Sequence, residues 1–142
     1  MIPNDVEARV RAIAAGMPVL EKMGIVVDAL DVGRAEMSMP FQRELAQHHG
    51  YQHAGITTLL ADTTGGLAAA TMMPTDSNVL SVEFKINLLA PARGDRFRSV
   101  GRVLRPGRTL TAVEVDVFAD SGSRSDLIAR LQQTCIRIPD RS

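Results

Sequence analysis

The chain has 142 residues, a length that suits one domain with a moderate hydrophobic core. Its 16 Lys and Arg residues balance 16 Asp and Glu residues, which argues against general nucleic-acid binding because that function needs a basic surface. The single cysteine, Cys135, allows no internal disulfide and fits a reducing, cytoplasmic setting. We therefore expect one cytoplasmic domain over residues 1–142.

A short amphipathic helix is predicted near the N-terminus, over residues 4–15. Its apolar side chains recur at helical spacing and form one stripe of Val6, Val10, Ile13 and Met17. A glycine and a proline then end the helix. Two short strands are predicted next, at about residues 24–31 and 34–40, and a loop without a clear period follows at 41–53.

The most unusual stretch is QHAGITTLLADTTGGLAAATMM, residues 52–73. Between residues 45 and 75 the only formally charged side chain is Asp62. Ala, Leu and Met favour a helix over residues 55–73, and the following proline ends it. The segment is apolar nearly all round, so we expect protein around it, while Asp62 and a glycine pair argue against a membrane span. A lone ionised carboxylate in this setting is unfavourable unless something binds it or uses it.

The rest of the chain supplies strands that can surround this helix. Residues 79–89 alternate apolar and polar side chains, which predicts a half-buried strand with Ser81 on its polar face. Further strands are predicted near 95–105, 109–119 and 126–138. The connections APARGD, RPGR and ADSGSRSD are only turn-length, so the strands that they join should be antiparallel neighbours. The sum is an α+β fold, an antiparallel sheet of about six strands wrapped round one long buried helix.

The start of the long helix offers unpaired backbone N–H groups and the positive end of a dipole. The small residues Ala54 and Gly55 leave this backbone open to a ligand oxygen, as an oxyanion hole requires. Asp62 is then a candidate general base or nucleophile. It lies eight residues beyond Ala54, about 12 Å along a helix, so one chain cannot easily aim both groups at one carbonyl. We therefore predict a homodimer with two equivalent sites, each taking one group from each chain.

These residues belong to a longer set of motifs, Gln47, His53-Ala54-Gly55, Leu60-Ala61-Asp62 and Gly65-Gly66. The set resembles the HGG…LxD…G signature of PaaI-type acyl-CoA thioesterases, in the 4-hydroxybenzoyl-CoA thioesterase-like superfamily. The run SVEFKINLLAPARGDRF and the turn RPGRTL are similar to the same family, so the resemblance spans about residues 20–138. It implies the hotdog fold and a homodimer, often assembled as a dimer of dimers.

The resemblance also implies roles for individual residues. Asp62 would activate water or attack the thioester, and the Ala54 N–H would polarise the thioester carbonyl. His53 and Gln47 would position the thioester or the water, and Ser81 would orient the water. The sequence departs from the family pattern in having Ala54 where HGG has its first glycine. An alanine keeps the N–H, while its methyl group narrows the approach.

Structural explanations stand beside these roles. Asp62 could be an acid held by Thr58, Thr63 or backbone donors. His53 could be a loop histidine that bonds to the backbone, and Gln47 could simply tie down its loop. The sequence leaves these readings open.

Three histidines within six residues, His48, His49 and His53, invite a metal reading. No acid or cysteine in the segment completes a site, so we predict no metal, and no cofactor beyond the coenzyme A part of the substrate. The arginines between residues 93 and 108 form either a solvated sheet edge or a contact for coenzyme A phosphates. For that contact we name Arg105 and Arg108.

The sequence thus predicts a cytoplasmic acyl-CoA thioesterase, with a small-molecule substrate and no nucleic-acid or membrane partner. Two alternatives stay open: a non-catalytic acyl-CoA-binding module, and a hotdog hydratase acting on enoyl thioesters. The lone Asp62 argues against the first, because a binding module has no use for an unpaired acid. His53 beside the helix start keeps the second possible. The acyl group is not predicted.

Overall fold

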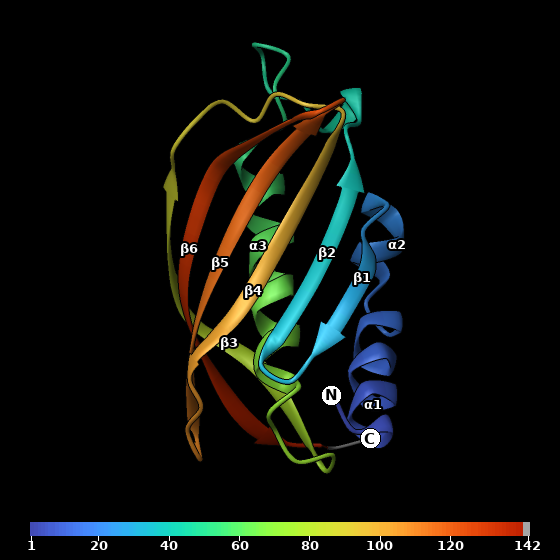
Figure 1. The fold of residues 1–142 in the computed structure, drawn as a ribbon, viewed down its shortest axis with the longest axis vertical. Coiled ribbons are helices and arrows are strands. Elements are labelled where there is room, and N and C mark those ends of the chain that lie inside the picture. The colour runs from blue at the N-terminus through green and yellow to red at the C-terminus, as the bar shows by residue number, and fades with distance from the viewer. Residues whose placement is uncertain (141–142) are drawn as a thin grey trace.

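The fold is built on a six-stranded antiparallel sheet with the strand order β1-β2-β4-β5-β6-β3 (Figure 1). The computed structural model describes residues 1–140. Its strands are β1 (Val26–Asp31), β2 (Arg34–Pro40), β3 (Ser77–Leu88), β4 (Arg96–Arg105), β5 (Leu110–Ser121) and β6 (Arg124–Pro139). The antiparallel sheet is confirmed, and β4, β5 and β6 are antiparallel neighbours as predicted. The prediction that β3 and β4 are neighbours is wrong, because β3 pairs with β6 and β4 lies between β2 and β5.

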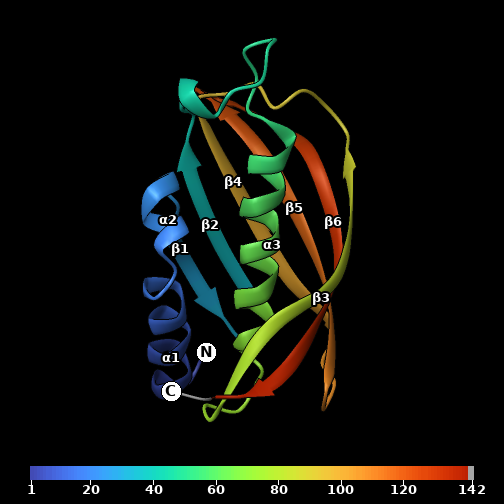
Figure 2. The ribbon, with the colours of Figure 1, turned by 180° about the vertical axis from the view of Figure 1, so that it is seen from behind.

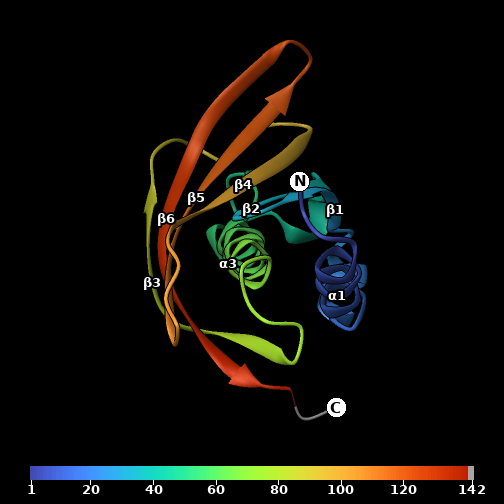
Figure 3. The ribbon, with the colours of Figure 1, turned by 60° about the horizontal axis from the view of Figure 1, so that its bottom comes forward.

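One long helix, α3 (Ala54–Ala70), runs across the concave face of the sheet (Figure 2). Figure 3 looks along α3 and shows the sheet curving round it. Two shorter helices, α1 (Asn4–Ala15) and α2 (Pro18–Met23), lie beside β1. None of the helices in residues 1–140 is long and apolar enough to cross a membrane. The predicted arrangement of a sheet wrapped round one helix, with a short N-terminal helix, is therefore confirmed.

The sequence analysis missed two short elements, α2 and a 3-10 turn at Arg43–Leu45. It treated Pro18 only as a stop signal for the first helix, whereas Pro18 begins α2. Proline is favoured in the first turn of a helix because the N–H it lacks would have no partner there. Gly24 ends α2 with a left-handed φ of 70°, which turns the chain into β1.

The core lies between α3 and the sheet. Leu60 and Leu67 of α3 are fully buried and pack in one cluster with Phe97, Met37 and Met39 of the sheet. Burying a side chain of this size contributes about 1.5–3 kcal/mol relative to leaving it exposed. The packing fixes the rotation of α3, so that its polar side chains take defined positions.

One stripe of α3 is only partly covered by the rest of the protomer, and it consists of Thr58, Leu59, Asp62, Thr63 and Gly66. Their spacing of three and four residues places them on one face of the helix. A single protomer therefore does not cover the helix on all sides, and Asp62 is half-buried.

Strand β3 forms one edge of the sheet and is exposed along most of its length. Its exposed apolar side chains are Leu80, Val82, Phe84 and Leu88, with exposed fractions of 56%, 55%, 44% and 57%. A long apolar edge strand is a ready template for pairing with another chain. The protomer therefore presents an edge suited to a further strand.

A β-bulge interrupts β3 between Ser81 and Glu83. Val79 and Ile86 both pack against the core, although a regular strand would send residues an odd number apart to opposite faces. The extra residue of the bulge reverses the alternation, so Ser81 shares the inward face with Val79. The regular alternation predicted over residues 79–89 is wrong for this reason.

Candidate active site

Asp62 of α3 is held by side chains from two strands. Its Oδ1 accepts a hydrogen bond from Ser81 Oγ of β3 at 2.6 Å and another from Gln133 Nε2 of β6 at 2.5 Å. Gln133 Nε2 also lies 2.9 Å from Ser81 Oγ, so the three groups form a closed network. Within residues 1–140, Oδ2 accepts no hydrogen bond and no cation pairs with the carboxylate. Neutral donors thus orient the carboxylate and leave one oxygen for a ligand or a water.

Ser81 reaches Asp62 because of the bulge in β3. Strict alternation predicted Ser81 on the outward, polar face of its strand, away from α3. The structure instead brings Ser81 and Asp62 together. Bulges are frequent next to active sites, where they re-aim a side chain. The irregularity of β3 is therefore what completes this part of the site.

Gln133 is the residue of this network that sequence reasoning missed. It is only 3% exposed and lies on the inward face of β6 between the buried residues Leu131 and Cys135. Glutamine is seldom this buried, and a polar residue at an inward position of an apolar strand is the signal that could have identified it. The register of β6 against β3 then brings it beside Ser81.

A cavity of about 270 Å³ opens beside Asp62. Its apolar walls are formed by Met17, Leu67, Val79 and Leu80. Pockets of this kind, mostly apolar with few polar groups, bind small molecules and fix their orientation through those groups. The free oxygen of Asp62 is therefore placed beside space suited to an apolar group.

Cys135 lies close to this carboxylate, but its chemistry excludes it as a nucleophile. The thiol is fully buried. Burial, and then the negative charge of Asp62, raise the pKa of the Cys135 thiol to about 12. The thiolate is the reactive form of cysteine, so a thiol with this pKa is inert near neutral pH.

The start of α3 forms a second group of candidate residues. The His53 ring caps the helix, because its Nδ1 accepts a hydrogen bond from the Gly55 N–H at 2.9 Å. The neutral ring therefore carries its proton on Nε2. The Ile56 and Thr57 N–H groups bond to the His53 carbonyl. Among the described residues, the Ala54 N–H has no partner, so it is the first-turn amide left for a ligand.

Gly55 leaves room for the His53 ring that caps α3. A Cβ at this position would lie 3.1 Å from His53 Nδ1 and 3.3 Å from its Cε1, which is tighter than ordinary contact. A side chain at residue 55 would therefore press on the capping ring. The N–H of Gly55 donates to His53 and is not available to a ligand, unlike the N–H of Ala54, which has no partner in the described chain.

Gln47 holds the loop before α3. Its Oε1 accepts hydrogen bonds from the His49 N–H at 2.6 Å and from the Tyr51 N–H at 3.2 Å. These contacts fit the loop-tying role that the sequence analysis gave as an alternative. Gln47 also lines a cavity of about 480 Å³ together with Ala54. The structure therefore brings Gln47 and the free Ala54 N–H to one cavity.

The loop histidines were the one metal motif considered in the sequence. The rings of His48 and His49 lie against each other, with centroids 4.1 Å apart. His53 uses one ring nitrogen as the helix cap. Within residues 1–140 there is no cluster of three or more histidine, cysteine or acidic side chains able to hold a metal.

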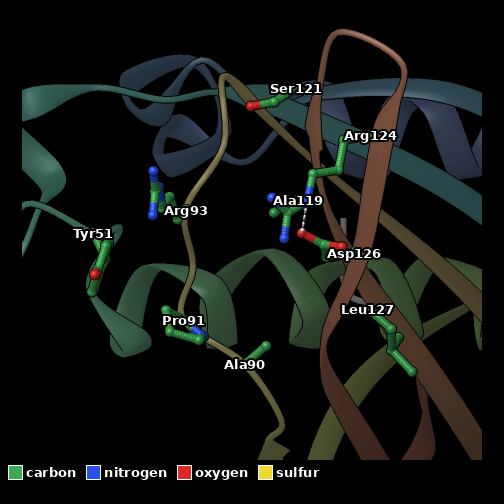
Figure 4. A pocket seen from close by; sticks show the side chains of 9 residues that line it. All are labelled: Tyr51, Ala90, Pro91, Arg93, Ala119, Ser121, Arg124, Asp126 and Leu127. Atoms are coloured by element: carbon green, nitrogen blue, oxygen red, sulfur yellow. Dashed lines mark ion pairs between the residues drawn. The ribbon is translucent and has the colours of Figure 1, made fainter.

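A third cavity, of about 510 Å³, adjoins the helix start and shares Tyr51, Ala90 and Pro91 with the cavity beside Ala54. Figure 4 shows Arg93 lining this space, together with the Arg124–Asp126 ion pair, whose charged atoms lie 2.8 Å apart. No ion pair to Arg93 is found in the part of the chain that the structure describes. A free cation therefore lines a cavity next to the helix start.

The other arginines of this region fall into two groups. Arg96, Arg98 and Arg102 form ion pairs with acidic side chains, at distances of 3.6, 3.2 and 3.4 Å. Arg105 and Arg108 are exposed and form no ion pair within residues 1–140. Arg105 is the last residue of β4, and Arg108 lies in the turn after it. This end of β4 lies away from the start of α3 (Figure 1).

Arg102 belongs to a network with Arg130 and Asp116 on the outer face of the sheet. Arg102 and Arg130 both bond to Asp116, which is 6% exposed. Burial by itself would raise the pKa of Asp116, but the hydrogen bonds and charges of Arg130 and Arg102 outweigh it and hold that pKa below its ordinary value. These arginines are therefore occupied by structural partners.

The candidate residues thus fall into two half-sites within one protomer. Asp62 and Ser81 line one cavity, and Ala54 and Gln47 line another. The separation of about 12 Å along the helix, predicted from the sequence, keeps the Ala54 N–H and the Asp62 carboxylate apart. Neither half-site alone offers both an oxyanion donor and a carboxylate.

Comparison with known proteins gives the family. The model of the thioesterase superfamily matches residues 49–125. A putative esterase of Saccharolobus solfataricus is 36% identical over 72% of this chain and 71% of its own length. A proofreading thioesterase of Klebsiella pneumoniae is 28% identical over 72% of this chain and 74% of its own length.

Solved structures agree with this. A thioesterase family protein from Silicibacter pomeroyi superposes with a TM-score of 0.93 at 38% identity, covering 95% of this chain and 99% of that one. The PaaI protein of E. coli superposes with a TM-score of 0.86 at 18% identity, over 97% of this chain and 96% of that one, and so shares its fold. The predicted resemblance and the hotdog fold are confirmed. The chain belongs to the thioesterase superfamily and is a hydrolase of that family.

Proposed function

We propose that the protein hydrolyses acyl-CoA thioesters at sites formed by two protomers. The observation that carries the proposal is the set of contacts that the Asp62 carboxylate makes. Its carboxylate is oriented by Ser81 and Gln133, and no cation pairs with it in the described chain. A base must keep an oxygen free to take a proton, and Oδ2 meets that requirement.

Two uncovered surfaces support a homodimer. The apolar edge of β3 is exposed, and the stripe of α3 that carries Asp62 is only partly covered. Pairing β3 with its copy about a two-fold axis would continue the sheet and cover both surfaces at once. It would also allow the Ala54 end of one α3 to approach the Asp62 of the other. Assembly into a dimer of dimers rests on the family resemblance alone.

The chemistry then follows from the two half-sites. A water oxygen attacks the thioester carbonyl carbon while Asp62 Oδ2 takes the water proton. The Ala54 N–H of the partner protomer donates to the carbonyl oxygen, where negative charge develops. The tetrahedral intermediate collapses with cleavage of the C–S bond, and the thiolate leaving group takes the proton from Asp62. In the alternative route an oxygen of Asp62 attacks the thioester carbonyl carbon, the C–S bond breaks and the CoA thiolate leaves. Water then hydrolyses the resulting anhydride to the free acid and regenerates Asp62.

The other residues take supporting roles in this proposal. Ser81 orients the water together with Asp62, and the Gln47 amide and the His53 ring position the thioester. The acyl group occupies the apolar cavity beside Asp62. The phosphates of coenzyme A bind unpaired arginines: Arg105 and Arg108 are the candidates named from the arginine cluster in the sequence, and Arg93 is favoured by its cavity next to Ala54.

The test measures thiol release from short, medium, long and aryl acyl-CoAs, with Asp62→Asn alongside. We expect release from part of the panel and a loss of about 10²–10⁴-fold in the variant. Asp76→Asn, at an exposed acid, is the control and should keep activity. Near-wild-type hydrolysis of every good substrate by Asp62→Asn would refute the proposal. A crotonyl thioester is included because hydration would leave the thioester intact, whereas hydrolysis frees the thiol.

A further inference from the structure

The two glycines in the middle of α3 face different surroundings. A Cβ on Gly65 would come within 1.9 Å of Gln133 Oε1 and 3.0 Å of Val115 Cγ2. A Cβ on Gly66 would meet nothing within 4 Å. Gly65 therefore leaves room for one particular side chain, that of Gln133. Of the two glycines, only Gly66 is on the open side of the helix.

Gln133 fills the space at Gly65 and turns its amide nitrogen toward Asp62. Nε2 lies 2.5 Å from Asp62 Oδ1, 2.9 Å from Ser81 Oγ and 3.2 Å from the Asp62 carbonyl oxygen. An amide nitrogen has two hydrogens to donate. All the donor capacity of Gln133 is therefore directed to Asp62 and to the serine that bonds to it.

Stability alone does not explain this arrangement. Gln133 Oε1 is buried without a hydrogen-bond partner, which is unfavourable for a polar atom. An apolar side chain of the same length would avoid that buried oxygen, and alanine at residue 65 would be the better helix former. The unpaired oxygen of Gln133 and the glycine inside the helix each lower stability, and two such unfavourable features at one place are typical of functional sites.

We propose that Gln133 is a positioning residue for hydrolysis, and that Gly65 is the space that admits it. The inference rests on the proposed function, because that function gives Asp62 a proton to take. Gln133 holds Oδ1, so that Oδ2 stays directed at the cavity. The amide of Gln133 is neutral, so it orients the Asp62 carboxylate without neutralising its charge. A paired arginine would neutralise that charge.

The first test replaces Gln133 with methionine, which has a similar length and no donor. We expect kcat for a good acyl-CoA to fall about 10²-fold while KM stays within about twofold, since the carboxylate loses its orientation and the substrate contacts remain. A kcat within about threefold of wild type would overturn the proposal.

Ser99→Ala is the matched control for this variant. Ser99 is fully buried and hydrogen-bonds to Thr64 of α3, so its loss also removes a buried bond between the helix and the sheet. We expect a lower melting temperature and an unchanged kcat. An equal fall in kcat in Ser99→Ala and Gln133→Met would show a general loss of packing and would overturn the positioning role.

A double-mutant cycle tests the space at Gly65. Gly65→Ala should displace Gln133 and lower both kcat and the melting temperature. In a Gln133→Ala background only the tight contact with Val115 Cγ2, at 3.0 Å, remains. Gly65→Ala should then leave kcat unchanged and lower the melting temperature much less than in the wild type. Equal losses in the two backgrounds would overturn the assignment of Gly65 to Gln133.

The cycle separates failure of this inference from failure of the proposed function. Its melting temperatures need no substrate. If the wild type hydrolyses no thioester, the positioning role falls together with the proposed function, while the coupling of Gly65 and Gln133 is still measured. If the wild type hydrolyses thioesters and the cycle is additive, the proposed function stands and the inference is wrong.

Discussion

The two half-sites of the protomer are built in different ways. The candidate polar groups at the start of α3 come from one short segment, residues 47–57, and the key group is a backbone N–H, while residues 88–92 and Ile128 complete the cavity. The half-site at Asp62 combines side chains from α3, β3 and β6, so that Ser81 and Gln133 come from distant parts of the chain. The first depends on local backbone geometry and the second on the register of the sheet.

This difference teaches what each half-site can tolerate. A backbone donor survives any substitution that keeps the N–H and the helix start, which explains why Ala54 can replace a glycine. The Asp62 half-site depends on a bulge, on a buried glutamine and on the space at Gly65. Small changes far away in the sequence can therefore disturb it.

The largest effect is expected from a variant that keeps two protomers apart, so that the half-sites of different chains no longer meet. Val82→Lys places a charge on the exposed apolar edge of β3, and a charged edge strand resists pairing. We expect a monomer in sedimentation experiments and a loss of activity of about 10²–10⁴-fold, because each Asp62 loses the partner's oxyanion donor. Leu104→Lys, at an equally exposed residue of β4, is the control and should remain dimeric and active. A fully active monomer would contradict the two-chain site.

The next effect tests the backbone donor alone. Ala54→Pro removes the N–H at the first position of α3, where proline fits the helix and no hydrogen bond of the described chain is lost. We expect kcat to fall about 10²–10³-fold with little change in melting temperature. Ala54→Gly keeps the N–H and should stay active. Similar kcat values for these two variants would remove Ala54 from the mechanism.

A smaller effect tests the side-chain partner of Asp62. Ser81→Ala removes one hydrogen bond to a charged group, and we expect kcat to fall about tenfold. Ser125→Ala is the control, since Ser125 bonds to an aspartate in the same way outside the site, with its Oγ 2.5 Å from Asp120 Oδ1. Steady-state kinetics should show no change there. Equal effects of the two variants would argue against a role for Ser81.

The smallest effect concerns the cap of α3. His53→Ala removes the side-chain acceptor for the Gly55 N–H, and urea unfolding should show a loss of about 1 kcal/mol. His53→Asn supplies another good cap and should restore the stability. If His53 also positions the thioester, kcat stays low in His53→Asn despite the restored stability. Full recovery of both would leave His53 as a cap only.

Much of the fold could be predicted from the sequence, because the relevant signals are local. The apolar run of α3, the alternation of the strands and the short turns between them fix the helix and its antiparallel sheet. The helix-start half-site was predicted for the same reason, since Gln47, His53 and Ala54 lie close together in the chain. Pro18 shows the limit of such signals, because it can end one helix and begin another.

The Asp62 half-site could be predicted only in part, because its other members depend on tertiary structure. Alternation placed Ser81 on the wrong face, since the bulge in β3 depends on pairing with β6 and not on a local motif. Gln133 carries no motif and acquires its place only when β6 is in register with β3. The half-exposure of Asp62 in one protomer likewise depends on how far the sheet wraps round α3.

The most direct test of the central claim mixes two inactive variants. Asp62→Asn keeps the Ala54 donor, and Ala54→Pro keeps the carboxylate, so a dimer of one copy of each contains one intact site if the sites are shared. Co-refolding equal amounts should give half mixed dimers and restore about a quarter of wild-type thioesterase activity. A mixture as inactive as the separate variants, with mixed dimers shown by differential tagging, would place the whole site within one chain and contradict the account.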